Sequence, residues 1–287
     1  MGHHDLLAKV CETYRAQRAM GGEAVEHPLA CLVRCPEHPL IYDANHVGGI
    51  RAQTAQEIAE LFDACDGFFP AQVQHRKFFV DVYTPQPFVA HLTCEGYGLT
   101  TSLQLVLEGD LRANPPEIEI EEATCAEGWL RVAALLRLDH LDEALRDRRD
   151  PFPEEVTAGL VAVRQSMSPE MRMWIARSDA SDCGFFASWP GRNGVGMVEW
   201  LFIKPERRRR GIATALIAHA VADARDRGAG PVLIGASAVG DGVPRRMYAA
   251  LGFEPICVTH EFVAARVKRE STSRESDTLE SASSERA

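Results

Sequence analysis

The sequence is poor in the features that assign a chain to a specialised class. Its eight cysteines are scattered without paired spacings, which argues against a disulfide framework or a zinc site. The one cluster, Cys31 and Cys35 with nearby His38, has no matching second half downstream, so we expect packing cysteines and no metal. No run of about 18 apolar residues occurs, so the usual signal of a membrane-spanning helix is missing.

Positive charge is also in short supply. Lys and Arg number 31 against 41 Asp and Glu, a formal net charge of −10, which disfavours a general nucleic-acid binder because phosphates need a basic surface. The first ten residues lack the apolar core and small-residue cleavage site of a signal peptide. We therefore expect a cytoplasmic protein with neither nucleic acid nor membrane as its partner.

What is present is typical of a soluble globular protein, with 46% apolar and 25% charged residues in a chain of 287. That length suits one large domain or two ordinary ones. The polar, proline-containing stretch "DLRANPP" at 110–116 reads as a linker. We predict one domain over 1–112, a second over 113–265, and a disordered tail over 266–287, where almost no apolar residue occurs.

Both segments mix strands and helices, which predicts the α+β class. The first shows short strands at 30–35 and 40–45, a helix opened by the capping-box pair Thr54 and Glu57, and a strand, short helix and long strand over 77–109. The second predicts a strand at 117–123, helices at 127–138 and 153–167 joined by a charged loop, three strands, a helix after Gly211, a strand, a short helix and a last strand.

The stretch "PERRRRGIATAL" at 205–216 carries the strongest chemical signal. Four consecutive arginines could be an idle solvated run or a basic address, but they are wedged between the strand "MVEWLFI" and a helix. A strand, a tight turn and a helix N-terminus gather unpaired backbone N–H groups at one point, and such a point binds phosphate. Gly211 and Ala213 leave these amides unscreened.

This segment, with "RRMYAALGFEP" downstream, resembles the GNAT-type N-acetyltransferase superfamily over residues 117–263. Arg208, Gly211 and Ala213 fill the family's Arg/Gln-x-x-Gly-x-Gly/Ala loop, and Tyr248 stands four residues before the Gly252-Phe253 pair. The resemblance implies the GNAT fold, a mixed and mostly antiparallel sheet flanked by helices. It also implies acetyl-CoA as acyl donor, held in a cleft between two splayed strands.

Carried over by position, the resemblance implies that the pyrophosphate binds the loop residues Arg208, Arg209, Arg210, Gly211, Ile212, Ala213 and Thr214. Leu201 and Ile203 would pair their backbone with the pantetheine arm. Asp241 stands where many members have an Asn that touches this arm, although capping the following helix is an alternative role.

Tyr248 is the candidate general acid, because a phenol keeps its proton at neutral pH and can donate it to a departing thiolate. Glu199 is the candidate base, on the same strand face as Leu201 and Ile203 if no bulge intervenes. Each has a plainer alternative: a packing tyrosine, and a carboxylate that faces solvent or an arginine. His219 and His260 fit structural or surface roles better than catalysis.

The charged loop between the first two helices of the second segment partly roofs the acceptor groove in this family. Its carboxylates, Asp139, Asp142, Glu143, Asp147 and Asp150, could favour a cationic acceptor, or could simply confer solubility. We therefore expect an amine acceptor, either a small molecule or a protein amine, and the sequence does not identify it further.

The first segment repeats part of the second. Residues 80–109 and the closing part of the second segment both read strand, proline-led short helix, Gly-aromatic, long strand. This suggests a tandem arrangement with a degenerate N-terminal copy, the alternative being an independent α+β module. We expect an acetyl-CoA-dependent N-acyltransferase; a non-catalytic coenzyme A sensor or scaffold is the alternative.

Overall fold

The structure is a computed structural model that describes residues 2–240 and 242–265. Asp241 and the predicted disordered tail lie outside the described residues. Among the helices within these ranges, none is long and apolar enough to cross a membrane.

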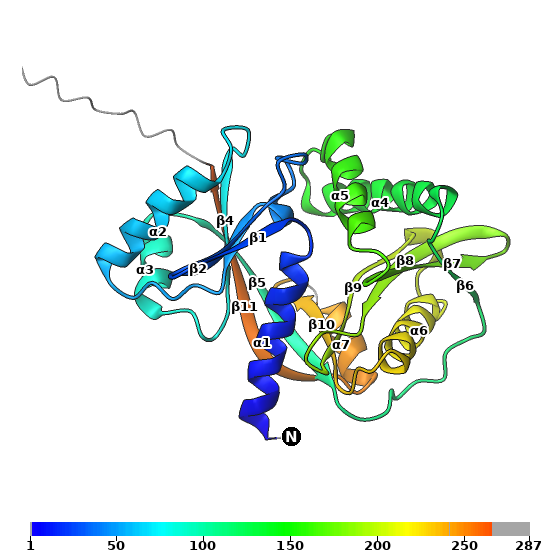
Figure 1. The fold of residues 1–287 in the computed structure, drawn as a ribbon. Coiled ribbons are helices and arrows are strands. Elements are labelled where there is room, and N and C mark those ends of the chain that lie inside the picture. The colour runs from blue at the N-terminus through cyan, green and yellow to red at the C-terminus, as the bar shows by residue number, and fades with distance from the viewer. Residues whose placement is uncertain (1, 241, 266–287) are drawn as a thin grey trace, which may run out of the picture.

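All strands of the described chain join one sheet in the order β1-β2-β3-β4-β11-β5-β10-β9-β8-β7-β6 (Figure 1). The strands are β1 Glu23–His27, β2 Ala30–Arg34, β3 His46–Gly48, β4 His75–Val80, β5 Gly98–Leu107, β6 Glu119–Glu122, β7 Arg172–Ser178, β8 Ser181–Trp189, β9 Gly196–Ile203, β10 Val232–Ser237 and β11 Glu254–Ala265. The helices are α1 His3–Ala19, α2 Ala55–Phe68, α3 Gln86–Cys94, α4 Ala126–Asp147, α5 Glu154–Ser166, α6 Ile212–Asp226 and α7 Val243–Ala250. Most strand pairs are antiparallel; β3 with β4 and β9 with β10 are parallel.

Two strands exchange places between the halves of the chain. β5, from the first half, pairs with β10, and β11, from the second half, pairs with β4. The two exchanged strands also pair with each other, from Glu254 opposite Val106 to Val263 opposite Gly98. The predicted boundary at residues 112 and 113 falls in the connection between β5 and β6, yet the sheet runs across it without a break.

The internal repeat predicted from the sequence is visible as two equal units. β4-α3-β5 and β10-α7-β11 are each a strand, a helix with a proline in its first turn, and a long strand. The predicted capping box is also present: the Glu57 amide donates to Thr54, and the Glu57 carboxylate accepts from the Thr54 and Gln53 amides.

Helices cover both faces of the sheet. α1, α4 and α5 bury their apolar side chains in one cluster that extends over both halves and includes Tyr14, Phe79, Trp129 and Trp189. On the other face, α6 and α7 cover the second half and α2 and α3 the first. α1 lies at the junction, where the Thr13 hydroxyl donates to Val195 beside β9 (Figure 1).

Two element predictions are wrong. Residues 40–45 do not form a strand but a turn around the 3-10 helix Tyr42–Ala44, because Asn45 donates its side-chain amide to the carbonyls of His38 and Ile41. The charged stretch after residue 138 is not a loop, since α4 continues through it to Asp147. The polar strand β1 was not predicted, because its residues show no apolar alternation.

Candidate functional site

The sheet forks between β9 and β10. The two strands pair in parallel from Gly196 opposite Val232 to Val198 opposite Ile234, and the pairing stops there although both strands continue. Beyond this point β9 runs on to Ile203 and β10 to Ser237, so their facing backbone groups are left without a partner strand. A fork of this kind offers strand edges to an extended ligand that carries amides.

A β-bulge lies on β9 inside the fork. Between the pairs Ala187 with Glu199 and Phe185 with Phe202, β9 has one residue more than β8, and Trp200 has a positive φ of 64°. The expectation that Glu199 shares a face with Leu201 and Ile203 is therefore wrong. Leu201 and Ile203 pack with the α6 and α7 cluster, whereas Glu199 lies on the α1 side.

The turn after β9 presents free backbone amides. Arg208 is extended, Arg209 has a φ of 63°, and Gly211 has a φ of 79° as the N-cap of α6. Ala215 is the first residue of α6 whose amide is bonded, to the Gly211 carbonyl at 3.0 Å. Within the described residues no side chain caps this helix, and its first turn holds no acidic residue, so its N–H groups and dipole are available to an anion.

The corresponding helix of the first half differs on this point. At the start of α2 the Glu57 carboxylate accepts from two backbone amides, at 2.7 and 3.0 Å, and so occupies the anion position with the protein's own charge. The N-terminus of α2 is thus neutralised by the protein's own carboxylate, whereas that of α6 is open.

The four arginines of the turn are not equivalent. Arg207 pairs with Asp179 at 2.6 Å, and Arg208 donates to the Ile203 carbonyl and to Asp142 of α4 at 2.6 Å. Arg209 and Arg210 are exposed, and the described part of the chain gives neither of them a hydrogen bond or an ion pair. Arg208 thus holds the turn in place, and the next two arginines remain free to contact a ligand.

Gly211 is required for two reasons. Its positive φ is costly for other residues, and an added Cβ would lie 2.9 Å from the ring of Pro116. The connection between β5 and β6 therefore packs directly against the turn. It also donates the Arg112 amide to the Leu251 carbonyl at the end of α7, so it passes both helices beside the fork.

Arg209 stands in a conformation that glycine adopts more easily, which gives a prediction. We expect Arg209→Gly to be more stable than Arg209→Ala by about 1 kcal/mol, since only the alanine variant keeps the left-handed strain. Both variants lose the same charge, so their difference in stability reports the backbone conformation alone. Thermal unfolding measures this difference, and equal stability of the pair would contradict the assigned conformation.

Tyr248 lies on α7 and is 5% exposed, in the cluster that α6 and α7 share. Burial raises the pKa of its phenol above the ordinary value, and the negative charge of Glu199 raises it further. The two groups therefore interact electrostatically although they belong to opposite faces of the sheet. The fork is the place where the sheet between them is open.

Glu199 is buried and paired. Its Oε1 accepts from Arg18 of α1 at 3.0 Å, and both side chains are 11% exposed. Burial raises the pKa of Glu199 in spite of this ion pair, and its Oε2 has no hydrogen-bond partner among the described residues. The alternative in which Glu199 faces an arginine is thus what the structure shows, and the free oxygen is the part of the group left to act as a base.

Other candidate residues have structural partners. His219 packs edge-on against Trp174, and His260 shares a hydrogen bond with the Thr101 hydroxyl at 3.0 Å. Cys35 contacts Glu37 at 3.7 Å, and no group of three or more His, Cys, Asp or Glu that could hold a metal occurs in the residues searched, those that the structure describes. The acidic groups around the end of α4 are mostly paired with arginines, as the pairs Asp142 with Arg146 and Glu143 with Arg149 show.

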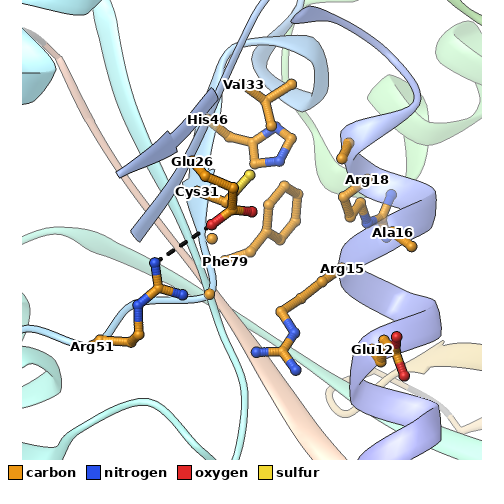
Figure 2. Close-up of a pocket in the computed structure, with 13 residues that line it drawn as sticks. Glu12, Arg15, Ala16, Arg18, Glu26, Cys31, Val33, His46, Arg51 and Phe79 are labelled. Atoms are coloured by element: carbon orange, nitrogen blue, oxygen red, sulfur yellow. Dashed lines mark hydrogen bonds and ion pairs between the residues drawn. The ribbon is translucent and has the colours of Figure 1, made fainter. Parts of the chain in front are cut away.

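A cavity of about 310 Å³ lies on the α1 side of the first half (Figure 2). Arg15, Arg18 and Glu12 line it from α1, and Glu26 and Arg51 form an ion pair at 3.5 Å on the opposite side. Between them lie Phe79, His46 and Cys31. Burial lowers the pKa of His46 to about 3 and raises that of Cys31 to about 11, so both are neutral at physiological pH.

Sequence reasoning did not identify the residues that the first half contributes beside the fork. Arg18 comes from α1, and Asp43 lies 3.9 Å from it in the turn before β3. Neither belongs to a motif. The sequence could have predicted one contact of Arg18, its stacking on Tyr14, because residues four apart are neighbours on a helix.

Comparisons with known proteins agree with this architecture. The family model described as "Acetyltransferase (GNAT) domain" matches residues 169–255, the part that contains the fork, the turn and Tyr248. Residues 169–255 therefore match the GNAT acetyltransferase family. A search of the curated proteins found no match.

Among solved structures, a GCN5-related N-acetyltransferase from Kribbella flavida shares 16% identity, covers 89% of this chain and 94% of its own, and has a TM-score of 0.64. A functionally unknown conserved protein from Staphylococcus epidermidis has a TM-score of 0.65 at 12% identity, over 86% and 95% of the two chains. A tandem GNAT protein from the clavulanic acid biosynthesis pathway has a TM-score of 0.52 at 15% identity, over 75% and 70%. The predicted tandem GNAT fold is thus confirmed, and the first half is GNAT-like rather than an unrelated module.

Proposed function

We propose that the protein is an acetyl-CoA-dependent N-acyltransferase that moves an acetyl group to a primary amine by direct attack on the thioester. The observation that carries the proposal is the fork between β9 and β10, with free helix amides at its end and Tyr248 and Glu199 on its two sides. In this arrangement donor and acceptor approach from opposite faces of the sheet and meet in line.

The donor would occupy the α6 and α7 side. The amides from Arg209 to Thr214 would bind the pyrophosphate, with Arg209 and Arg210 adding charge-assisted hydrogen bonds. The backbone of Leu201 and Ile203 would pair with the pantetheine amides along the unpaired edge of β9.

The acceptor would approach from the α1 side, where Glu199 lies. As the amine nitrogen attacks the carbonyl carbon, Glu199 or a water bound to its free oxygen would take the amine proton. Tyr248 would give its proton to the sulfur as the carbon–sulfur bond breaks. The products would be an N-acetyl amine and free coenzyme A.

A coenzyme A-binding sensor or scaffold without catalysis is the second candidate. The ion pair of Glu199 with Arg18 favours it, because a carboxylate held by a guanidinium is a weaker base. The two functions predict the same binding of acetyl-CoA and differ only in turnover.

Calorimetry with acetyl-CoA, followed by thiol release from acetyl-CoA with a panel of amines, tests both functions. The acyltransferase predicts binding at micromolar ligand and thiol release that depends on the amine. Binding of acetyl-CoA without thiol release with any of the amines would favour the non-catalytic sensor or scaffold. Gly211→Val should abolish binding while Gly67→Val in α2 of the first half binds normally, since an added Cβ meets Pro116 at the first position and nothing within 4 Å at the second.

A further inference from the structure

Arg164 lies on the acceptor side and has no part in the roles described above. It lies on α5, and its guanidinium stacks 4.3 Å from the centre of the Trp200 ring, the residue that the β-bulge turns toward α5. Its Nε and Nη1 are buried and have no hydrogen-bond partner among the described residues. A buried guanidinium with unused donors is costly, so such a group points to a ligand.

Other buried polar atoms near Arg164 also have no hydrogen-bond partner among the described residues. A cavity of about 20 Å³ lies beside it, lined by Gln17 and Arg18 of α1, Asp43, Leu160, Met167 and Trp200. Gln17 Oε1, Arg18 Nε and Glu199 Oε2 are also buried without a hydrogen-bond partner in the described chain. The space suffices for one water-sized group, such as a water molecule or one oxygen of a carboxylate.

The N–H donors of Arg164 do not bond to the nearby carboxylates. Asp139, Asp43 and Glu199 are close enough to favour its charged form, but none makes an ion pair or hydrogen bond with it. Burial lowers the pKa of Arg164 only to about 10, so the group is a cation at neutral pH. The planar fork of a guanidinium matches a carboxylate in a bidentate geometry.

We propose that the acceptor is a small amine that also carries a carboxylate, an amino acid, and that Arg164 binds this carboxylate. The inference rests on the proposed function and specifies its acceptor. Glu199 and Trp200 are adjacent on β9, and the charge of Glu199 acts on Arg164, so a small molecule with its carboxylate at Arg164 would have its amino group near Glu199.

The reaction is then complete in atoms and charge. The amino nitrogen bonds to the acetyl carbon, the carbon–sulfur bond breaks, the amine proton goes to Glu199 or its water, and the sulfur receives a proton from Tyr248. The carboxylate does not react and serves only to place the amine. An N-acetyl amino acid and coenzyme A are released, and proton exchange with solvent returns Glu199 to the carboxylate and Tyr248 to the phenol.

The test compares α- and ω-amino acids with their carboxamides, which keep the amine and the size but lose the charge, as acceptors in the thiol-release assay. For the preferred chain length, we expect wild-type kcat/KM to be about 10- to 100-fold higher with the carboxylate than with the amide. Arg164→Met should remove this preference by lowering kcat/KM for the acid alone, and Arg164→Lys should retain part of it. The control is Arg192→Met, on the exposed loop before β9, where Arg192 pairs with Glu170.

Binding of the N-acetyl amino acid products, measured by calorimetry, gives a second readout without turnover. We expect wild type to bind them and Arg164→Met to bind them about 10-fold or more weakly. Equal kcat/KM for acid and amide would overturn the carboxylate assignment while leaving the acyltransferase intact. Absence of thiol release with every amine would instead contradict the proposed function, and equal product binding by wild type and Arg164→Met would then decide against Arg164.

Discussion

Replacement of Tyr248 by Phe is expected to lower kcat for acetyl transfer by about 10²- to 10³-fold and to change the Michaelis constant for acetyl-CoA less than about 3-fold. The phenol ring is buried in the α6 and α7 cluster, so Phe preserves the packing and removes only the hydroxyl. Burial and the charge of Glu199 raise the pKa of Tyr248. The phenol therefore stays protonated at pH values at which the acceptor amine is already neutral. The kcat of the wild type should therefore not fall on the alkaline side below about pH 10.

Tyr83→Phe is the matched control, because Tyr83 is half exposed and lies in the first half, away from the fork. It should leave kcat unchanged. Retention of wild-type kcat by Tyr248→Phe would remove Tyr248 from the chemistry and make it a packing residue. Pre-steady-state release of thiol separates the chemical step from product release, so that a slow later step does not hide the effect.

Replacement of Arg18 by Met is expected to reduce the free energy of unfolding by about 3–5 kcal/mol. Arg18 is the common partner of two carboxylates, Glu199 on β9 and Asp43 before β3, and it stacks on Tyr14 and Phe79. Met fills most of the volume but leaves the buried Glu199 charge without its cation. The loss arises from this unpaired charge rather than from the net strength of the ion pair.

A double-mutant cycle tests this explanation by urea unfolding. Glu199→Gln removes the charge, so the double variant should recover much of the stability that Arg18→Met loses. Lys9→Met, on the same helix with its exposed partner Asp5, should change the free energy of unfolding by less than about 1 kcal/mol. Additive losses in the double variant would show that Arg18 acts by packing alone.

Local patterns predicted most elements of the second half. The span of β9 and the position of α6 follow from an apolar strand, a glycine and a helical apolar face, all of which are encoded within a few residues. The extension of α4 was missed because charged residues mark a solvated helix surface as often as a loop. The turn at residues 40–45 depends on a single side chain, Asn45, whose contacts no periodicity reveals.

The strand order could not be read in the same way. The two repeats have the same alternation, so the pattern of β5 or β11 fits either half equally well. The candidate site shows the same limit. Gly211 and Tyr248 follow from motif spacing, whereas Arg18 and Arg164 reach the fork only through tertiary packing, and the bulge at Trp200 reverses a face that alternation alone assigns.

The exchanged strands have a consequence for synthesis on the ribosome. β4 pairs with β11 and β5 with β10, so the first half cannot complete its hydrogen bonding until the second half has been made. During translation β4 and β5 remain open edges over more than a hundred residues of growing chain, a state prone to pairing with other nascent chains. The two halves therefore complete their folding together. A truncated messenger that lacks the codons for β11 would yield neither half in its native form.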